Sequence, residues 1–76
     1  MMEYDVYVKV KREDVHLLNH ILEVEENMFN IRSYDEEKGV LRIITPFPEE
    51  AVKLLEGCKE MVELEILGVE ENPGTA

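Results

Sequence analysis

The period at which apolar residues recur changes in a fixed order along this 76-residue chain. Period-two stretches, typical of half-buried strands, lie at residues 4–10, 29–34, 40–45 and 62–69, and a helical period separates the first two and the last two. This order predicts an α+β fold, a two-layer βαββαβ sandwich with both helices on one face of an antiparallel sheet. Because crossovers are right-handed, we expect the sheet order 4-1-3-2.

Each expected element has one apolar side that can contribute to a core. In the first strand Val6, Val8 and Val10 alternate with polar residues, and Cys58 falls among the apolar positions of the second helix. We expect residues 1–69 to form one domain and residues 70–76 to form a flexible C-terminal tail. A core this small rarely supplies more than ~3–5 kcal/mol, and domains of this size often gain stability by oligomerising.

The charge balance excludes several classes of partner. Eighteen acidic residues against eight basic ones give a net charge of −10, which repels nucleic acid and anionic membrane surfaces. The third strand also lacks the aromatic residues with which a sheet stacks RNA bases. No stretch approaches the roughly 20 apolar residues of a membrane span, and Cys58 has no pairing cysteine. We therefore expect a soluble cytoplasmic protein.

Catalytic patterns are missing from the sequence. The four glycines do not form a phosphate-binding loop, and the one serine, Ser33, lies on an expected strand without an elbow motif. The carboxylates cannot be assigned to an apolar pocket that would tune their pKa values for acid–base work. We expect no enzyme activity and no cofactor.

The sheet face that the helices leave uncovered is the best candidate for a functional surface. Aromatic and arginine side chains are enriched at interface cores. The proposed contact residues are Tyr7, Arg32, Tyr34, Arg42, Ile44 and Leu67. On this basis we expect a non-catalytic interaction or regulatory module, a homodimer formed through this face or a sheet edge, with a further protein partner as another possibility. A solvated antiparallel face is the simpler alternative.

Cross-strand charge pairs should lie on the same face. In the expected sheet order, Lys9 and Lys11 are opposite Glu63 and Glu65. Such exposed pairs contribute only ~0.2–1 kcal/mol each, so their main effect is on strand register.

Two histidines suggest a second type of function. His16 and His20 are four residues apart and project from one side of the first helix, which they share with Glu13 and Glu23. Imidazole and carboxylate ligands at this spacing can hold zinc or a related ion. A solvated helix face explains the same residues, and both interpretations remain open.

The chain resembles a family of short bacterial domains of unknown function. The matching segments are Val8-Lys9-Val10, residues 14–23 with Ile21-Leu22-Glu23, residues 39–46 and residues 49–55. The resemblance implies a ferredoxin-like or ACT-like fold and carries no functional residues. ACT domains bind amino acids at a dimer interface with a glycine-containing turn after the first strand, where this chain has Lys11-Arg12-Glu13-Asp14. An amino-acid-type effector at a dimer seam is therefore an alternative function.

Overall fold

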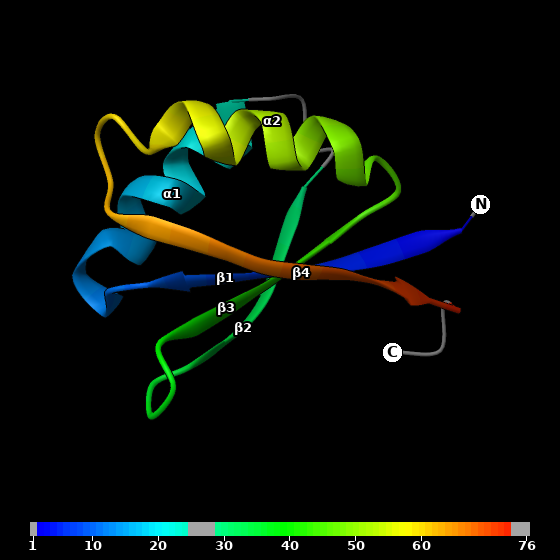
Figure 1. Cartoon of the computed structure of the whole chain (residues 1–76), viewed down its shortest axis with the longest axis horizontal. Helices are drawn as coiled ribbons and strands as arrows, with labels where there is room; N and C mark the ends of the chain where they lie inside the picture. Colours follow the sequence, from blue (N-terminus) through cyan, green and yellow to red (C-terminus); the bar gives the residue numbers. More distant parts are fainter. Residues whose placement is uncertain (1, 25–28, 74–76) are drawn as a thin grey trace.

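Six elements follow one another in the computed structural model, which describes residues 2–24 and 29–73 (Figure 1). Their bounds are β1 Glu3–Val10, α1 Arg12–Val24, β2 Asn30–Asp35, β3 Val40–Thr45, α2 Pro48–Cys58 and β4 Leu64–Asn72. Neither α1 nor α2 has the length and apolar composition that a membrane crossing requires.

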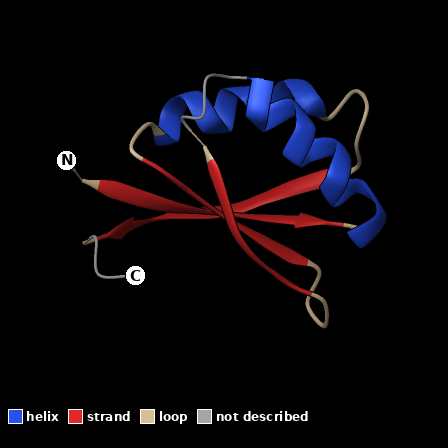
Figure 2. Ribbon diagram, turned by 180° about the vertical axis from the view of Figure 1, so that it is seen from behind, coloured by secondary structure: helices blue, strands red, loops and turns tan. Residues whose placement is uncertain are grey.

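The four strands form one antiparallel sheet in the order β2-β3-β1-β4, which is the predicted order read from the opposite edge. Both helices lie on the same side of this sheet and leave its other side uncovered (Figures 1 and 2). The predicted α+β class and sheet order are confirmed. We call the uncovered side the open face.

The core lies between the helices and the sheet, and central strand β1 contributes to it by strict alternation. Val6 and Val8 are fully buried, together with Leu18 of α1 and Leu55 of α2. Cys58 belongs to the same cluster, as its sequence position indicated, and burial raises the pKa of its thiol. Burying apolar surface at about 25 cal/mol per Å² is the main favourable term for such a core.

A β-bulge in β2 changes which face its last residues occupy. Ile31 pairs with Ile43 on the core side, but Ser33 pairs with Arg42, so Arg32 is an extra residue. The extra residue reverses the alternation, and Tyr34 consequently faces the helices and packs against the core. The prediction that Tyr34 lies on the open face was wrong, because strict alternation cannot anticipate a bulge.

A second bulge lies in β4 and lengthens the strand. Tyr7 pairs with Gly68 and Val8 with Ile66, which leaves Leu67 as the extra residue. Beyond the bulge, residues 70–72 pair with the start of β1, so the expected tail does not begin at residue 70. Strand pairing and a hydrogen bond from Asn72 to Asp5 hold the polar residues of this segment in place. Residues 74–76 lie outside the described part.

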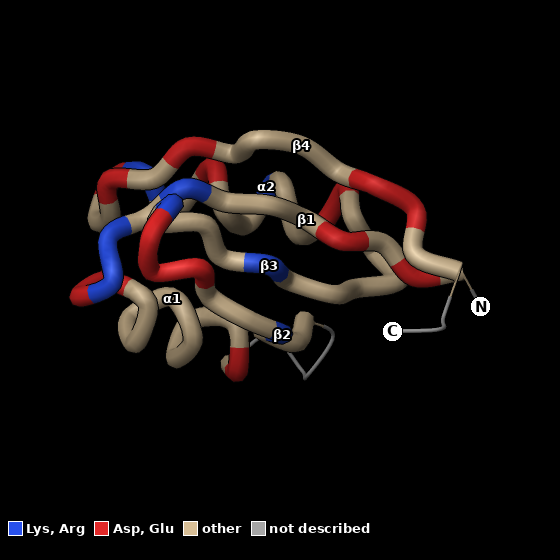
Figure 3. The backbone as a smooth tube through the Cα atoms, turned by 90° about the horizontal axis from the view of Figure 1, so that it is seen from below, with Lys and Arg blue, Asp and Glu red and all other residues tan. Residues whose placement is uncertain are grey.

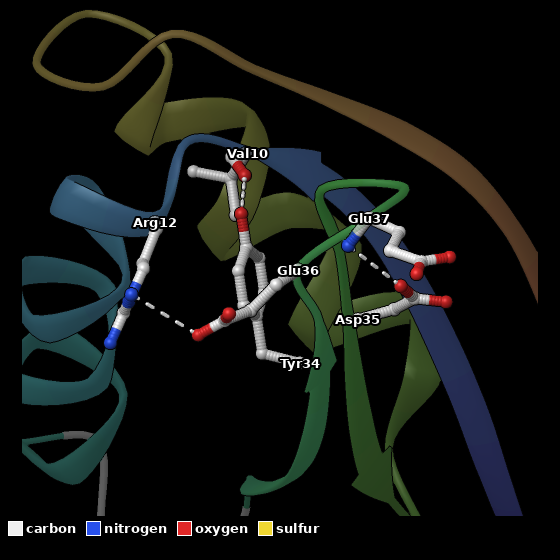
Figure 4. Close-up of polar contacts among 6 residues, drawn as sticks. All are labelled: Val10, Arg12, Tyr34, Asp35, Glu36 and Glu37. Atoms are coloured by element: carbon white, nitrogen blue, oxygen red, sulfur yellow. Dashed lines mark hydrogen bonds and ion pairs between the residues drawn. The ribbon is translucent and has the colours of Figure 1, made fainter.

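The hairpin between β2 and β3 is tied to the end of β1. The Asp35 carboxylate accepts hydrogen bonds from the backbone amides of Glu37 and Lys38, and Gly39 has a φ of 67°, which suits glycine. The hydroxyl of Tyr34 donates to the carbonyl of Val10 at 2.7 Å, and the amide of Val10 donates to the carbonyl of Gly39 at 2.9 Å (Figure 4). Both backbone groups of Val10 are thereby satisfied by the hairpin.

We predict that Tyr34→Phe lowers the free energy of unfolding by ~0.5–1.5 kcal/mol, because the Val10 carbonyl loses its partly buried donor. Urea denaturation monitored by circular dichroism measures the change. Tyr4→Phe on β1 is the matched control, since it removes a hydroxyl for which the described residues provide no hydrogen bond. Equal stabilities of the two variants would contradict the prediction.

Candidate functional site

The middle of the open face forms a shallow depression that residues of all four strands and of the hairpin line. Its lining includes Tyr7 of β1, Arg42 of β3 and Leu67 of β4. The rest of the lining is made by Ser33, Asp35, Lys38, Val40, Gly68, Val69 and Glu70. The lining therefore mixes apolar and charged side chains, the composition of a protein-contact surface rather than of an enclosed ligand pocket.

Asp5 anchors a polar network beside this depression. Its side chain lies on the open face, yet the residue is only 6% exposed. Nη2 of Arg42 donates to Oδ2 of Asp5 at 3.0 Å, and Nδ2 of Asn72 donates to Oδ1 at 3.1 Å. The network joins β3, β1 and β4 across the sheet. A carboxylate with both oxygens bonded in this way is stabilised against the cost of burial.

Arg42 is positioned by that carboxylate. Its hydrogen bond to Asp5 raises the pKa of the guanidinium, which stays charged in any case. The Nε atom of Arg42 is buried and has no hydrogen-bond partner among residues 2–24 and 29–73. Asp5 therefore determines where the guanidinium of Arg42 lies, and Arg42 already forms an ion pair within its own chain.

Tyr7 lies next to the same charges, opposite Arg42 and Gly68 in the register. Its pKa is raised, first by partial burial and then by the carboxylates of Asp5 and Glu70, the latter also a hydrogen-bond partner. The phenol is therefore neutral at physiological pH. It presents a ring to the depression and a hydroxyl to Glu70.

The structure brings together only some of the predicted contact residues. Tyr7, Arg42 and Leu67 line one depression, and Leu67 is 48% exposed. Arg32 is exposed at the bulge of edge strand β2, outside that lining. Tyr34 faces the other side of the sheet, as described above.

Ile44 lies on the open face but is only 6% exposed. It is flanked in the register by Asp5 and Asn30, and the Arg42 side chain on the same face reaches toward Asp5. The expectation that Ile44 offers contact area needs correction, because neighbouring strands already cover it. A face without a helix is not uniformly exposed.

The predicted cross-strand placement of these charges occurs, and the structure forms the ion pair of Lys11 with Glu63. Lys9 is opposite Glu65 in the register, and Nζ of Lys11 lies 3.6 Å from Oε2 of Glu63. The side chains of Lys11 and Glu63 are 64% and 85% exposed, so their contribution to stability is small.

The metal site at the two histidines stays a prediction. His16 and His20 are both exposed on α1, as their spacing indicated. Within the described ranges, no cluster of three or more histidine, cysteine or acidic residues is arranged to hold a metal ion. Two imidazoles alone fill two of the four ligand positions of a tetrahedral zinc site.

Sequence reasoning missed Asp5 and Asn72 as members of the site. An aspartate at an outward strand position and an asparagine near the C-terminus both suggest solvent exposure. One signal was available. In the predicted sheet order Asp5 and Arg42 lie on the same face of the two central strands, where unlike charges can pair across strands.

Comparison with known proteins assigns the family. The model of a family described as a domain of unknown function, DUF4911, matches residues 8–62, more than half of the chain. The chain belongs to the DUF4911 family. No curated protein and no solved structure matches this DUF4911 chain. The family match confirms the domain-of-unknown-function resemblance and adds no activity.

The matched residues of the DUF4911 chain run from β1 to just beyond α2 and therefore include Arg42, whereas Asp5 and Asn72 lie outside them. After β1, Lys11 alone connects to α1, so the DUF4911 chain has no loop where the ACT resemblance would place a glycine-containing turn.

We predict that Asp5→Asn lowers the free energy of unfolding by ~1–3 kcal/mol, because a half-buried guanidinium loses its counter-charge. Glu63→Gln, which removes the exposed pair with Lys11, is the matched control and should cost less than ~1 kcal/mol. Denaturant titration of both variants measures the difference. A larger loss in the control would contradict this account of the network.

The raised pKa of Tyr7 has a consequence for stability at high pH. The folded state holds the phenolic proton more tightly than the unfolded chain, so this contribution is present below the ordinary value of 10.0 and is lost as pH rises through the folded value. We predict that the tyrosinate absorbance lost in Tyr7→Phe has a midpoint above 10.0. Tyr7→Phe should also lose stability less steeply than the parent chain above this pH. A difference curve with a midpoint at or below 10.0 would show that the prediction is wrong.

Proposed function

We propose that this DUF4911 chain is a non-catalytic protein-interaction module that pairs with a second copy of itself through the open face. One observation carries the proposal: Leu67 remains 48% exposed in a depression that it shares with Tyr7 and Arg42, on a sheet side that no helix covers. Half-apolar sheet faces that stay exposed are typical of contact surfaces. Because the core is small, association with a second copy would add to the stability of the chain.

The distribution of charge favours a second copy as the occupant. In the register, the half of the open face near the N-terminus carries the carboxylates of Glu3, Asp5 and Glu70. Figure 3, which views this face, shows acidic segments and no basic ones at that end of the sheet. Lys9 and Lys38 lie on the other half, where Glu65 is opposite Lys9 in the register and Asp35 lines the depression beside Lys38.

A two-fold axis that reverses strand direction would make this face complementary to itself. It would set Lys9 and Lys38 of one copy over the carboxylates of the other, and the Leu67 regions over each other. Isologous contacts of this kind are the common form of homodimer. Asp5 and Arg42 would enter the contact already paired, so the dimer would not have to bury an isolated charge.

Three further assignments belong with the proposal: the fold type, the cellular setting and binding rather than catalysis. The element order, the sheet order and the two helices on one side support a ferredoxin-like arrangement. The buried thiol of Cys58 is compatible with a reducing, cytoplasmic setting. The shallow, open form of the depression supports binding rather than catalysis.

We predict that the chain sediments at micromolar concentration with twice its mass of 8.9 kDa, and that Leu67→Lys weakens this dimer by at least ~10-fold. Leu17→Lys on α1 is the matched control, since Leu17 is 42% exposed and lies on the helix side. Analytical ultracentrifugation measures both. A monomeric parent chain, or equal weakening by the two changes, refutes the proposed seam.

Salt provides a second readout with a defined sign. Two copies that each carry a net charge of −10 repel one another, and added salt should screen this overall repulsion more than it weakens the few lysine–carboxylate contacts of the seam. The dimer should therefore be tighter at about 0.5 M NaCl than at about 0.05 M. Weakening by salt would indicate that ion pairs, not Leu67 and its neighbours, dominate the contact.

A further inference from the structure

The outer edge of β4 is a second unpartnered feature, distinct from the open face. β4 is the last strand of the sheet, so the backbone groups on its outer side face no other strand in the described part of the chain. The strand has nine residues, whereas the opposite edge strand, β2, has six. An open edge of this length is a template on which another extended chain can add a strand.

The side chains along β4 indicate what kind of chain would fit. The strand contains Glu65, Glu70 and Glu71, all exposed, and Glu63 directly precedes it. It contains no lysine or proline, which often protect an edge from pairing, although it carries these glutamates and the bulge at Leu67. On the helix side of β4, Ile66 and Val69 lie opposite Val8 and Val6 in the register, and Val69 is 43% exposed, so this side can pack against apolar side chains of an added strand.

The same glutamates exclude the most obvious competitor. If two copies of β4 paired with each other, acidic residues of both edges would gather at one short seam, and like charges on paired strands are destabilising. A strand with alternating basic and apolar side chains would instead place positive charges next to the glutamates of β4. Its cations would lie on the open face beside Glu65 and Glu70, and its apolar residues would lie on the helix side beside Ile66 and Val69.

We propose that the outer edge of β4 binds an extended segment of another protein that alternates basic and apolar residues, adding it as a fifth strand. This site uses the outer backbone edge of β4 and does not depend on the homodimer, although Glu70 borders both surfaces. The backbone would supply most of the hydrogen bonds, and the glutamates would select the charge of the segment.

The test uses a synthetic, fluorescently labelled nine-residue peptide of alternating lysine and valine, matched in length to β4. An alternating glutamate and valine peptide is its control. Fluorescence anisotropy gives the affinity, and amide hydrogen exchange of the full chain shows where the peptide lies. We expect binding of the lysine peptide only, with new protection confined to amides of β4.

Two triple variants separate a local site from the general attraction of an acidic protein. Changing Glu65, Glu70 and Glu71 to glutamine should weaken binding by at least about fivefold. Changing Glu49, Glu50 and Glu60 to glutamine removes the same net charge at exposed positions in or near α2 and should leave the affinity within about twofold.

Equal weakening by the two triple variants, or protection that is absent from β4, overturns the proposal. Salt distinguishes its failure from that of the homodimer, because peptide binding should weaken with added NaCl while the dimer tightens.

Discussion

The uninterrupted alternation of β1 is the constraint on which the rest of the sheet depends. Its valines face the helices and its polar residues face the other way, from Glu3 to Val10. Both neighbours adjust to it: β3 pairs with it in continuous register, and β4 inserts one residue at Leu67. Because side chains on a strand alternate with a period of two, every such insertion determines which later residues reach which face.

Much of the fold follows from this periodicity and was accessible from the sequence. The element order, the sheet order, the burial of Cys58 and the pairing of Lys11 with Glu63 depend on local pattern and on handedness, and the structure has all of them. Local pattern is sufficient where each residue pairs one to one with its neighbour. The core of β1, α1 and α2 was predicted for this reason.

The site was harder to predict, because its membership depends on exceptions to the pattern. The bulge at Arg32 turns Tyr34 toward the helices, and the bulge at Leu67 precedes a segment of β4 that strict reasoning assigned to a tail. Asp5 is buried through partners that are 37 and 67 positions away in sequence. No local window contains that information, and the extra residue of a bulge has no reliable signature in a single chain.

The connection between β1 and α1 consists of Lys11 alone, and Arg12 at the start of α1 pairs with Glu36 of the hairpin at 3.3 Å (Figure 4). A link this short leaves the helix little freedom to rotate about its axis. Adding a single amino acid to the helix after that ion pair would turn everything downstream by ~100°. Leu18 and Leu22 would then leave the interior, so this junction should tolerate substitution far better than any change in length.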